Sequence, residues 1–149
     1  MNIYNISKIS DIHISEENTI GRFSHLKYLT ETVLPVISPR FVFVTGDMVD
    51  AAPGKNKQSI QKEREWKAYK NLLEQSEFLQ KHNKSIWFDL RGNHDSFNTP
   101  RFDHESNLFK EYSQTKSPNF QINYLTDYGS YIFHSIDGTY VIINMLLLL

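Results

Sequence analysis

Three short segments of this chain carry side chains of the kinds that bind metal ions. They are Asp11-Ile12-His13, the Gly-Asp-Met-Val-Asp run at 46–50 and the Arg-Gly-Asn-His-Asp run at 91–95. Each follows a short apolar run of the kind that forms a β-strand. Carboxylate, imidazole and amide groups are ligands for divalent metal ions. Gathered along one edge of a sheet, they predict a two-metal site that cleaves a phosphoester.

The combination of segments is informative, whereas Asp-x-His alone is not. Random order at this composition gives Asp-x-His about 0.3 times, Gly-Asp-x-x-Asp roughly 0.02 times and Gly-Asn-His-Asp roughly 0.001 times. The joint occurrence of the three segments therefore indicates a common site.

Composition limits the class of protein and the chemistry of the site. A length of 149 residues predicts one domain, and 40% hydrophobic with 22% charged residues is typical of a globular protein. The net charge of −1 gives no electrostatic reason to expect a nucleic-acid partner. The chain has no cysteine, so a metal must be bound through oxygen and imidazole nitrogen.

We expect neither a signal peptide nor a membrane span in this chain. The first strand is expected to begin almost at Met1, and Lys8 and Asp11 stand where a signal peptide has its apolar core. No segment reaches the about 18–20 apolar residues that a membrane helix requires. The apolar run at Val141–Leu149 is short and contains Asn144.

The order of expected elements indicates an α/β fold. We expect strands at Ile3–Ser10, Phe41–Val44 and Ser85–Leu90, and helices at Arg22–Leu34 and Ser59–Lys81. Pro35 and Pro39 are expected to close the first helix, and the run Phe41–Val44 is typical of a strand buried on both faces. Strands that alternate with helices predict a parallel sheet, which binds ligands at the carboxyl ends of its strands.

The pattern changes beyond Asp95. A short helix is expected between Pro100 and Tyr112, capped by Asp103. Two alternating runs, Tyr131–Ile136 and Thr139–Ile143, flank Asp-Gly and predict a β-hairpin.

In their order, the three segments resemble the first three sequence blocks of the calcineurin-like metallophosphoesterases. The surrounding sequence is most similar to a membrane-anchored eukaryotic branch of that superfamily, the transmembrane protein 62 type. The resemblance runs to roughly Ile143 and is carried by Ser10–Ser15, Phe41–Asp47, Glu65–Tyr69 and Trp87–Asp95. It implies the first half of a metallophosphoesterase α/β sandwich: parallel strands with two helices, then a β-hairpin.

The resemblance also assigns roles to the residues that bind metal. Asp11 and His13 would bind one ion, Asp47 would bridge the two ions and Asn93 would bind the second. The chain's own ligand types suit Fe, Mn or Zn without choosing among them. The nucleophile would be a metal-bound hydroxide.

The resemblance places His94 beside the leaving group, as proton donor or charge stabiliser. Asp95 is expected to orient that imidazole and raise its pKa. Asp50 is either an outer partner of the metal ligands or the cap of a following helix. Arg91 could meet the substrate phosphate, although a salt bridge that closes the strand is favoured.

Two further blocks of the family, a lone His at a strand end and then Gly-His-x-His, have no match here. Only His104 and His134 follow Asp95, and neither has a matching neighbourhood. We therefore expect an N-terminal portion of the domain whose C-terminal blocks are absent, poorly soluble or weak in metal binding when expressed alone. The rival to a hydrolase is a catalytically incomplete fragment or pseudoenzyme. A nucleic-acid-cleaving module ranks last, because no basic patch interleaved with aromatic residues is present.

Overall fold

The computed structural model describes residues 5–16, 19–53, 58–81, 87–99, 103–114, 122–124, 130–134 and 140–144. The elements in the first half are β1 (Ile6–Ile9), α1 (Thr19–Tyr28), the π-helical turn η1 (Leu29–Val33), α2 (Leu34–Ile37), β2 (Phe41–Val44) and α3 (Glu63–Gln75). They are followed by α4 (Glu77–Lys81), β3 (Trp87–Asp89), the 3-10 turn η2 (His94–Ser96), α5 (Leu108–Tyr112), β4 (Ile122–Tyr124), β5 (Ser130–His134) and β6 (Tyr140–Asn144).

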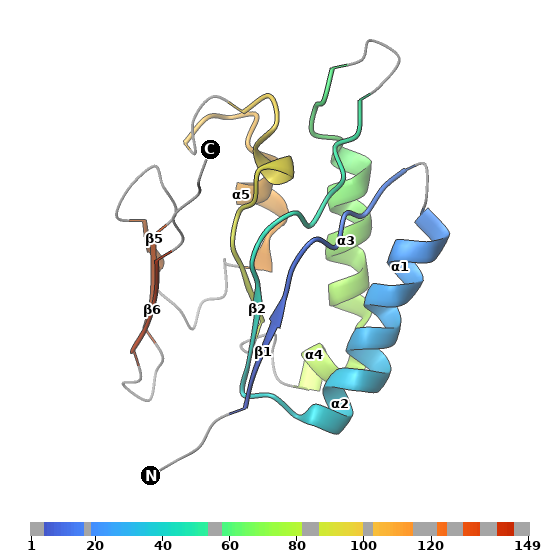
Figure 1. Cartoon of the computed structure of the whole chain (residues 1–149), viewed down its shortest axis with the longest axis vertical. Coiled ribbons are helices and arrows are strands. Elements are labelled where there is room, and N and C mark those ends of the chain that lie inside the picture. The colour runs from blue at the N-terminus through green and yellow to red at the C-terminus, as the bar shows by residue number, and fades with distance from the viewer. Residues whose placement is uncertain are drawn as a thin grey trace.

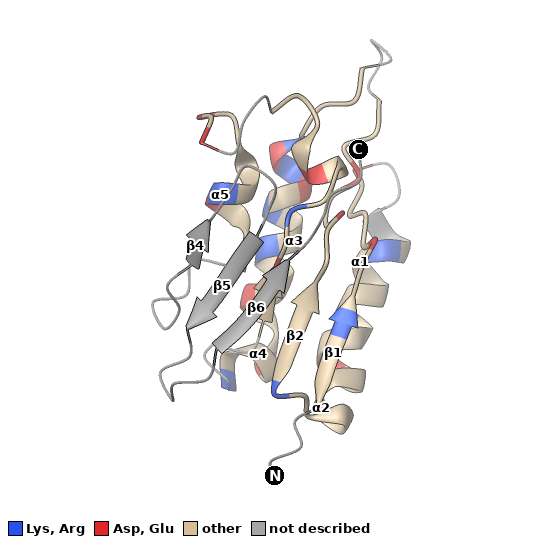
Figure 2. Ribbon diagram, turned by 60° about the vertical axis from the view of Figure 1, so that its left-hand side comes forward, with Lys and Arg blue, Asp and Glu red and all other residues tan. Residues whose placement is uncertain are grey.

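A parallel sheet in the order β1-β2-β3 positions the three sequence segments, as the expected α/β class requires. Ile9 pairs with Val44, and Val44 pairs with Asp89, so the three strands end level with one another. All four residues of β2 are buried, which confirms that this strand is covered on both faces. Figure 2 shows acidic residues just beyond the arrowheads of β1 and β2.

The helices α1, α3 and α4 lie on one side of this sheet (Figure 1). Val42, Val44 and Trp87 pack on that side in one core with Trp66 and Tyr69 of α3. On the opposite face of the sheet, three phenylalanines form a second apolar cluster, with ring centroids 5.2 to 6.3 Å apart: Phe41, Phe43 and Phe88. A sheet held from both faces keeps its strand ends in a fixed register.

The first helical segment continues past the proline that was expected to end it. Helix α2 includes Pro35 and ends at Ile37, where Ser38 adopts a left-handed conformation (φ 47°) and donates its N–H to Leu34. The π-helical turn immediately before Pro35 shifts the hydrogen-bond pattern, since the N–H of Leu34 reaches the carbonyl of Leu29. Such a widened turn accommodates a residue that has no N–H to donate.

The second predicted helix, Ser59–Lys81, is shorter and divided. Helix α3 begins only at Glu63, and Ser76 has an extended backbone (ψ 116°) between α3 and α4. The hydroxyl of Ser76 accepts the N–H of Leu79, which caps the start of α4. The serine therefore favours a new helix start over continuation of the old helix.

The remaining predictions were met in part. Helix α5 begins at Leu108 after Asn107, so the cap expected at Asp103 is wrong; Asp103 lies in an exposed turn. Strands β5 and β6 form the expected antiparallel pair, and β4 adds a third strand that the sequence did not predict. The Asp-Gly turn lies outside the described residues. No helix in the described part of the chain is long and apolar enough to cross a membrane.

Two glycines set the distance between the second and third segments. Gly46 has φ 109°, and a Cβ placed there would lie 2.7 Å from the Cα of Gly92. A Cβ on Gly92 would lie 2.2 Å from Oδ1 and 2.4 Å from the backbone N of Asp47. The two backbones therefore touch directly, and only glycine fits at either position.

Gly92→Ala should destabilise the fold by about 2 kcal/mol or more, because backbone atoms that cannot move aside meet the new methyl group. Gly21→Ala, in helix α1, is the matched control and should be neutral or stabilising. Urea unfolding followed by circular dichroism measures both. Equal unfolding midpoints for Gly92→Ala and the unsubstituted chain would show that the two loops do not need this contact.

A buried carboxyl group lies at the end of β3. Both Tyr69 Oη (2.6 Å) and Trp87 Nε1 (2.8 Å) donate to Asp89 Oδ1, and the backbone N–H of Gln114 donates to Oδ2 (2.7 Å). Burial raises the pKa of Asp89 to about 6, while these hydrogen bonds act in the opposite direction. The folded chain therefore holds this proton more tightly than the unfolded chain does.

Asp89 should make stability fall as pH rises from about 4 to about 6, by at most about 3 kcal/mol, because the unfolded state releases the proton first. The stability difference between the unsubstituted chain and Asp89→Asn, from urea unfolding at several pH values, isolates this contribution. Asp103→Asn, on an exposed carboxylate, is the control. A difference that stays constant over this pH window contradicts the prediction.

Candidate metal centre

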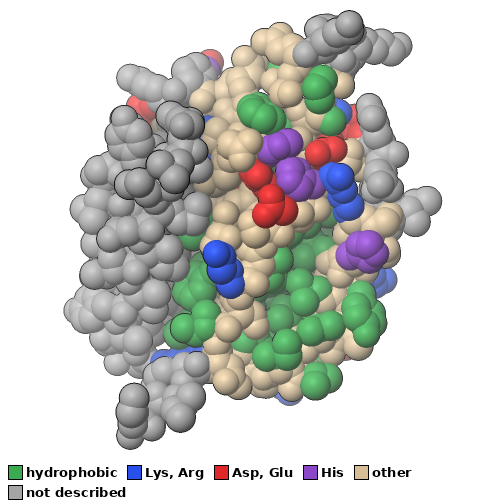
Figure 3. Space-filling model, viewed as in Figure 1, with side chains coloured by type: hydrophobic (Ala, Val, Ile, Leu, Met, Phe, Trp, Pro, Cys, Tyr) green, Lys and Arg blue, Asp and Glu red, His purple; other side chains and the backbone are tan. Residues whose placement is uncertain are grey.

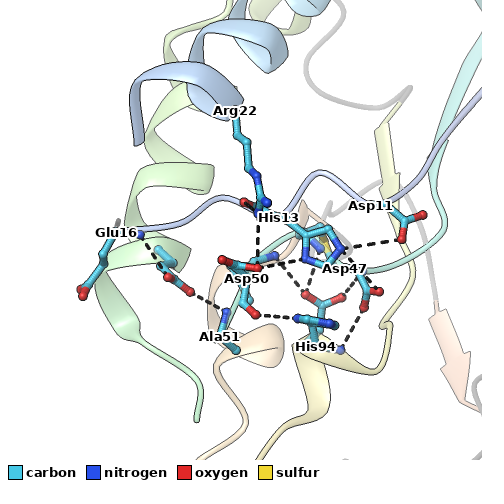
Figure 4. A network of polar contacts seen from close by, with 12 residues as sticks. Asp11, His13, Glu16, Arg22, Asp47, Asp50, Ala51 and His94 are labelled. Atoms are coloured by element: carbon cyan, nitrogen blue, oxygen red, sulfur yellow. Dashed lines mark hydrogen bonds and ion pairs between the residues drawn. The ribbon is translucent and has the colours of Figure 1, made fainter. Parts of the chain in front are cut away.

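The three predicted segments meet at the carboxyl end of the parallel sheet (Figure 4). The loops after β1 and β2 continue to pair beyond the strands: the N–H of Asp11 reaches the carbonyl of Gly46 (3.2 Å), and the N–H of His13 reaches that of Asp47 (2.8 Å). The side chains of the first two segments are thereby placed by main-chain bonds.

Three of the predicted ligand residues have a left-handed backbone. The φ angles are 56° for Asp11, 49° for His13 and 57° for Asp47. Asp and His are among the residue types that adopt this region most readily, yet it remains uncommon and is concentrated at functional sites. Between the first two, Ile12 packs against the core, so Asp11 and His13 are free to face the same point.

The donor atoms of Asp11, His13 and Asp47 converge. His13 Nε2 lies 3.7 Å from Asp11 Oδ1 and 4.0 Å from Asp47 Oδ2, too far for hydrogen bonds. Atoms that bind one ion at about 2.0–2.2 Å lie roughly 3–4 Å from one another. The spacing fits a shared cation, and these three residues form one of two groups of donors in the described residues that could hold one.

Asp50 lies on the far side of the His13 ring. Its Oδ1 is 3.4 Å from His13 Nδ1 and 3.2 Å from Arg22 Nη1. Arg22 also donates to the carbonyl of His13 (2.8 Å), so one guanidinium holds both the loop and its carboxylate. No helix starts at Asp50, because α3 begins at Glu63; the geometry therefore favours an outer partner of the histidine over a helix cap.

The charge of Asp50 is stabilised where it lies. Partial burial raises its pKa, but hydrogen bonds from Ser15 and Arg22 together with the Arg22 charge outweigh that effect and lower the pKa overall. The ionised carboxylate lies 3.4 Å from Nδ1, without a hydrogen bond to it. Its charge favours a hydrogen on that nitrogen, and Nε2 of His13 is the nitrogen nearest to Asp11 and Asp47.

His94 is held by main-chain groups of the second segment. Its Nδ1 contacts the carbonyl oxygen of Asp50 (2.5 Å), and its backbone N–H donates to Asp47 Oδ1 (2.9 Å). A carbonyl only accepts, so Nδ1 carries the hydrogen and Nε2 is the nitrogen that exchanges a proton. The ring lies edge-on to His13, with centroids 4.4 Å apart.

Asp95 has a different role from the one expected. Its buried carboxylate accepts four backbone N–H groups, those of Asp47 (2.7 Å), Met48 (3.0 Å), Val49 (3.3 Å) and Gly92 (2.8 Å). Both carboxylate oxygens of Asp95 face these N–H groups. The oxygen in contact with His94 Nδ1 is instead the main-chain carbonyl of Asp50. The expectation that Asp95 orients the imidazole is therefore wrong. Burial raises the pKa of Asp95 to about 7, against the opposing effect of its N–H donors.

Two further predicted residues lie at the edge of the site. Asn93 is exposed, next to His94, and its main-chain carbonyl accepts the N–H of Ser96 (3.0 Å). Arg91 is partly buried, and its Nε donates to the carbonyl of Asp95 (3.4 Å). Thus Arg91 braces the turn through a main-chain oxygen.

Glu65 is a functional residue that the sequence reasoning missed. It is 1% exposed on α3, and its two oxygens accept the N–H of Glu16 (3.1 Å), after the first segment, and of Ala51 (2.9 Å), after the second. Burial raises its pKa, and these N–H donors lower it. A sequence signal existed: Glu65 shares the i, i+4, i+7 spacing of the core residues Tyr69 and Leu72.

His104 is in neither group of candidate donors among the described residues. His104 Nδ1 contacts Ser106 within its own turn, through Oγ (2.7 Å) and the backbone N–H (3.1 Å). His134 lies in β5, and its side chain is outside the described part of the structure.

Comparisons with known proteins identify the family of this chain. The family model of the calcineurin-like phosphoesterases matches residues 6–145. Transmembrane protein 62 of Mus musculus is 33% identical over 139 residues, which are 93% of this chain and 21% of that protein. An Arabidopsis thaliana protein named "Putative metallophosphoesterase" is 33% identical over 111 residues, 72% of this chain and 14% of that protein. The chain thus spans a small part of the curated relatives it matches. From its sheet, its three loop segments and these matches, the chain belongs to the calcineurin-like phosphoesterase family.

Proposed function

We propose that this chain carries the metal-binding part of a phosphoester hydrolase with a dinuclear metal centre. The observation that carries the proposal is the convergence of Asp11, His13 and Asp47, with His13 Nε2 within 4.0 Å of both carboxylates. The similarity to Transmembrane protein 62 adds the proposal that the longer protein of this lineage is held at a membrane.

In this proposal Asp11 and His13 bind one ion, Asp47 lies between the two ions and Asn93 binds the second. Their oxygen and nitrogen donors suit Fe, Mn or Zn. When bound, such ions neutralise charge on the phosphate and lower the pKa of a water molecule. Asp47 lies between the first and third segments: its Oδ2 faces His13, and its Oδ1 accepts the N–H of His94, which orients the carboxylate.

His94 would supply a proton to the departing alcohol. Its Nδ1 is committed to the carbonyl of Asp50, which fixes the ring and leaves Nε2 to exchange the proton. Asp95 acts through the loops: by joining Asp47 to Gly92 it holds the second and third segments at a constant separation.

The second candidate is a chain that binds metal without catalysing a reaction. Among the described residues, those proposed for the second ion are Asp47 and Asn93, fewer than the family centre uses. His104 belongs to neither group of candidate donors in the described residues. Further ligands for the second ion would then have to come from outside the described residues.

Asp47→Asn should lower the affinity for Mn²⁺ by about tenfold or more and abolish hydrolysis of an aryl phosphate, because the bridging charge is lost. Calorimetric titration with Mn²⁺ measures the first effect, and release of the coloured phenol measures the second. Asp103→Asn, at an exposed turn, is the matched control. Unchanged Mn²⁺ affinity in Asp47→Asn contradicts the proposed centre.

His94→Ala should leave Mn²⁺ affinity within about threefold and reduce kcat for the aryl phosphate by about 10²–10⁴-fold, since a proton donor and not a ligand is removed. The reduction should be smaller for esters of more acidic phenols, which leave without a proton. His104→Ala is the control. A chain that binds Mn²⁺ but shows no hydrolysis before substitution supports the second candidate instead.

A further inference from the structure

We propose that the cleft between the loop after β1 and helix α1 receives the alcohol portion of the substrate, and that this portion is apolar. The inference rests on the proposed function, because it assigns the phosphate to the metal ligands at the end of this cleft. Its subject is the group esterified to that phosphate.

The cleft adjoins the candidate metal centre and has a volume of about 300 Å³. It is lined by Ile9, Ser10, Asp11, Ile12, His13, Arg22, His25, Leu26 and Leu29. Figure 3 shows an apolar area that extends along this face from the cluster of Asp and His side chains. Asp11 and His13 belong to both the cleft and the centre, so a substrate whose phosphate is bound at the centre can extend directly into the cleft.

The lining divides by chemistry. Ile9, Ile12, Leu26 and Leu29 offer no hydrogen bond, so a sugar or a charged group placed against them would lose its hydration without replacement. An alkyl or aryl group gains about three- to fourfold in affinity for each methylene removed from water. These four side chains therefore favour an apolar ester group, although Ser10 and His25 add polar atoms to the lining.

The charged side of the cleft lies where the phosphate would be. Arg22 is held in place by Asp50 and by the carbonyl of His13, while its side chain stays 39% exposed. A fixed, partly exposed guanidinium beside the metal ligands favours an anion at this end. The ligand is thus defined as a molecule with a phosphate at one end and an apolar group at the other.

The size of the cleft limits the apolar group. A volume of about 300 Å³ is at the lower end of the range for small-molecule sites. One aromatic ring or a short alkyl chain fits this space. The proposed substrate class is accordingly a phosphoester of a small hydrophobic alcohol.

Alkylphosphonates test this proposal, because they bind as phosphate analogues and cannot be hydrolysed. Calorimetry on the Mn²⁺-loaded chain should show affinity that rises from methylphosphonate through butylphosphonate to hexylphosphonate, by about threefold per methylene until the cleft is full. Equal affinities for the three compounds would overturn the proposal. Failure of methylphosphonate to bind would overturn the proposed function, and this inference with it.

Two variants and one control locate the effect. Leu29→Gln should flatten the rise with chain length and leave methylphosphonate affinity unchanged. His25→Leu, at an exposed lining position, should strengthen hexylphosphonate binding alone. Tyr28→Gln, on the neighbouring residue that is 61% exposed and outside the lining, should change nothing. A chain-length dependence that is the same in all variants would place the apolar group elsewhere and overturn the proposal.

Discussion

The arrangement of the site depends on buried carboxylates that accept main-chain N–H groups. Asp95 of the third loop accepts three N–H groups of the second loop and one of its own loop, and Glu65 joins the first loop to the second through two such bonds. A buried carboxylate is costly unless its oxygens are satisfied, and loops have N–H groups that no strand partner uses. The carboxylates and the N–H groups therefore satisfy one another, and these bonds join the three loops.

This arrangement separates the residues that hold the site from those that act in it. The donor atoms of Asp11, His13 and Asp47 face one common point, and the distances between them leave space there for a cation. Asp50 lies behind the His13 ring, Arg22 holds the main-chain carbonyl of His13, and the carbonyl of Asp50 contacts the ring of His94. Since the acting side chains are oriented by neighbours outside the common point, their donor atoms remain available.

The sequence predicted what depends on local pattern and residue type. The apolar run of β2 and the order of strands and helices predicted the α/β class, and the segments contained the side chains that converge, Asp11, His13 and Asp47. It could not predict interactions between distant residues. For example, the carboxylate of Asp95 accepts the N–H groups of Asp47–Val49 rather than orienting the His94 imidazole as expected. The course through Pro35 and the break at Ser76 were also missed, because a π turn and a serine cap change helix boundaries without altering hydrophobic periodicity.

The contact between Gly46 and Gly92 has a consequence for how this centre can be transferred or varied. Because two bare backbones meet there, the closest approach of the second loop to the third is set by the van der Waals radii of main-chain atoms. A side chain at either position would push Asp47 away from the third loop. A design that grafts these loops onto another parallel sheet needs this glycine pair as much as it needs the ligands.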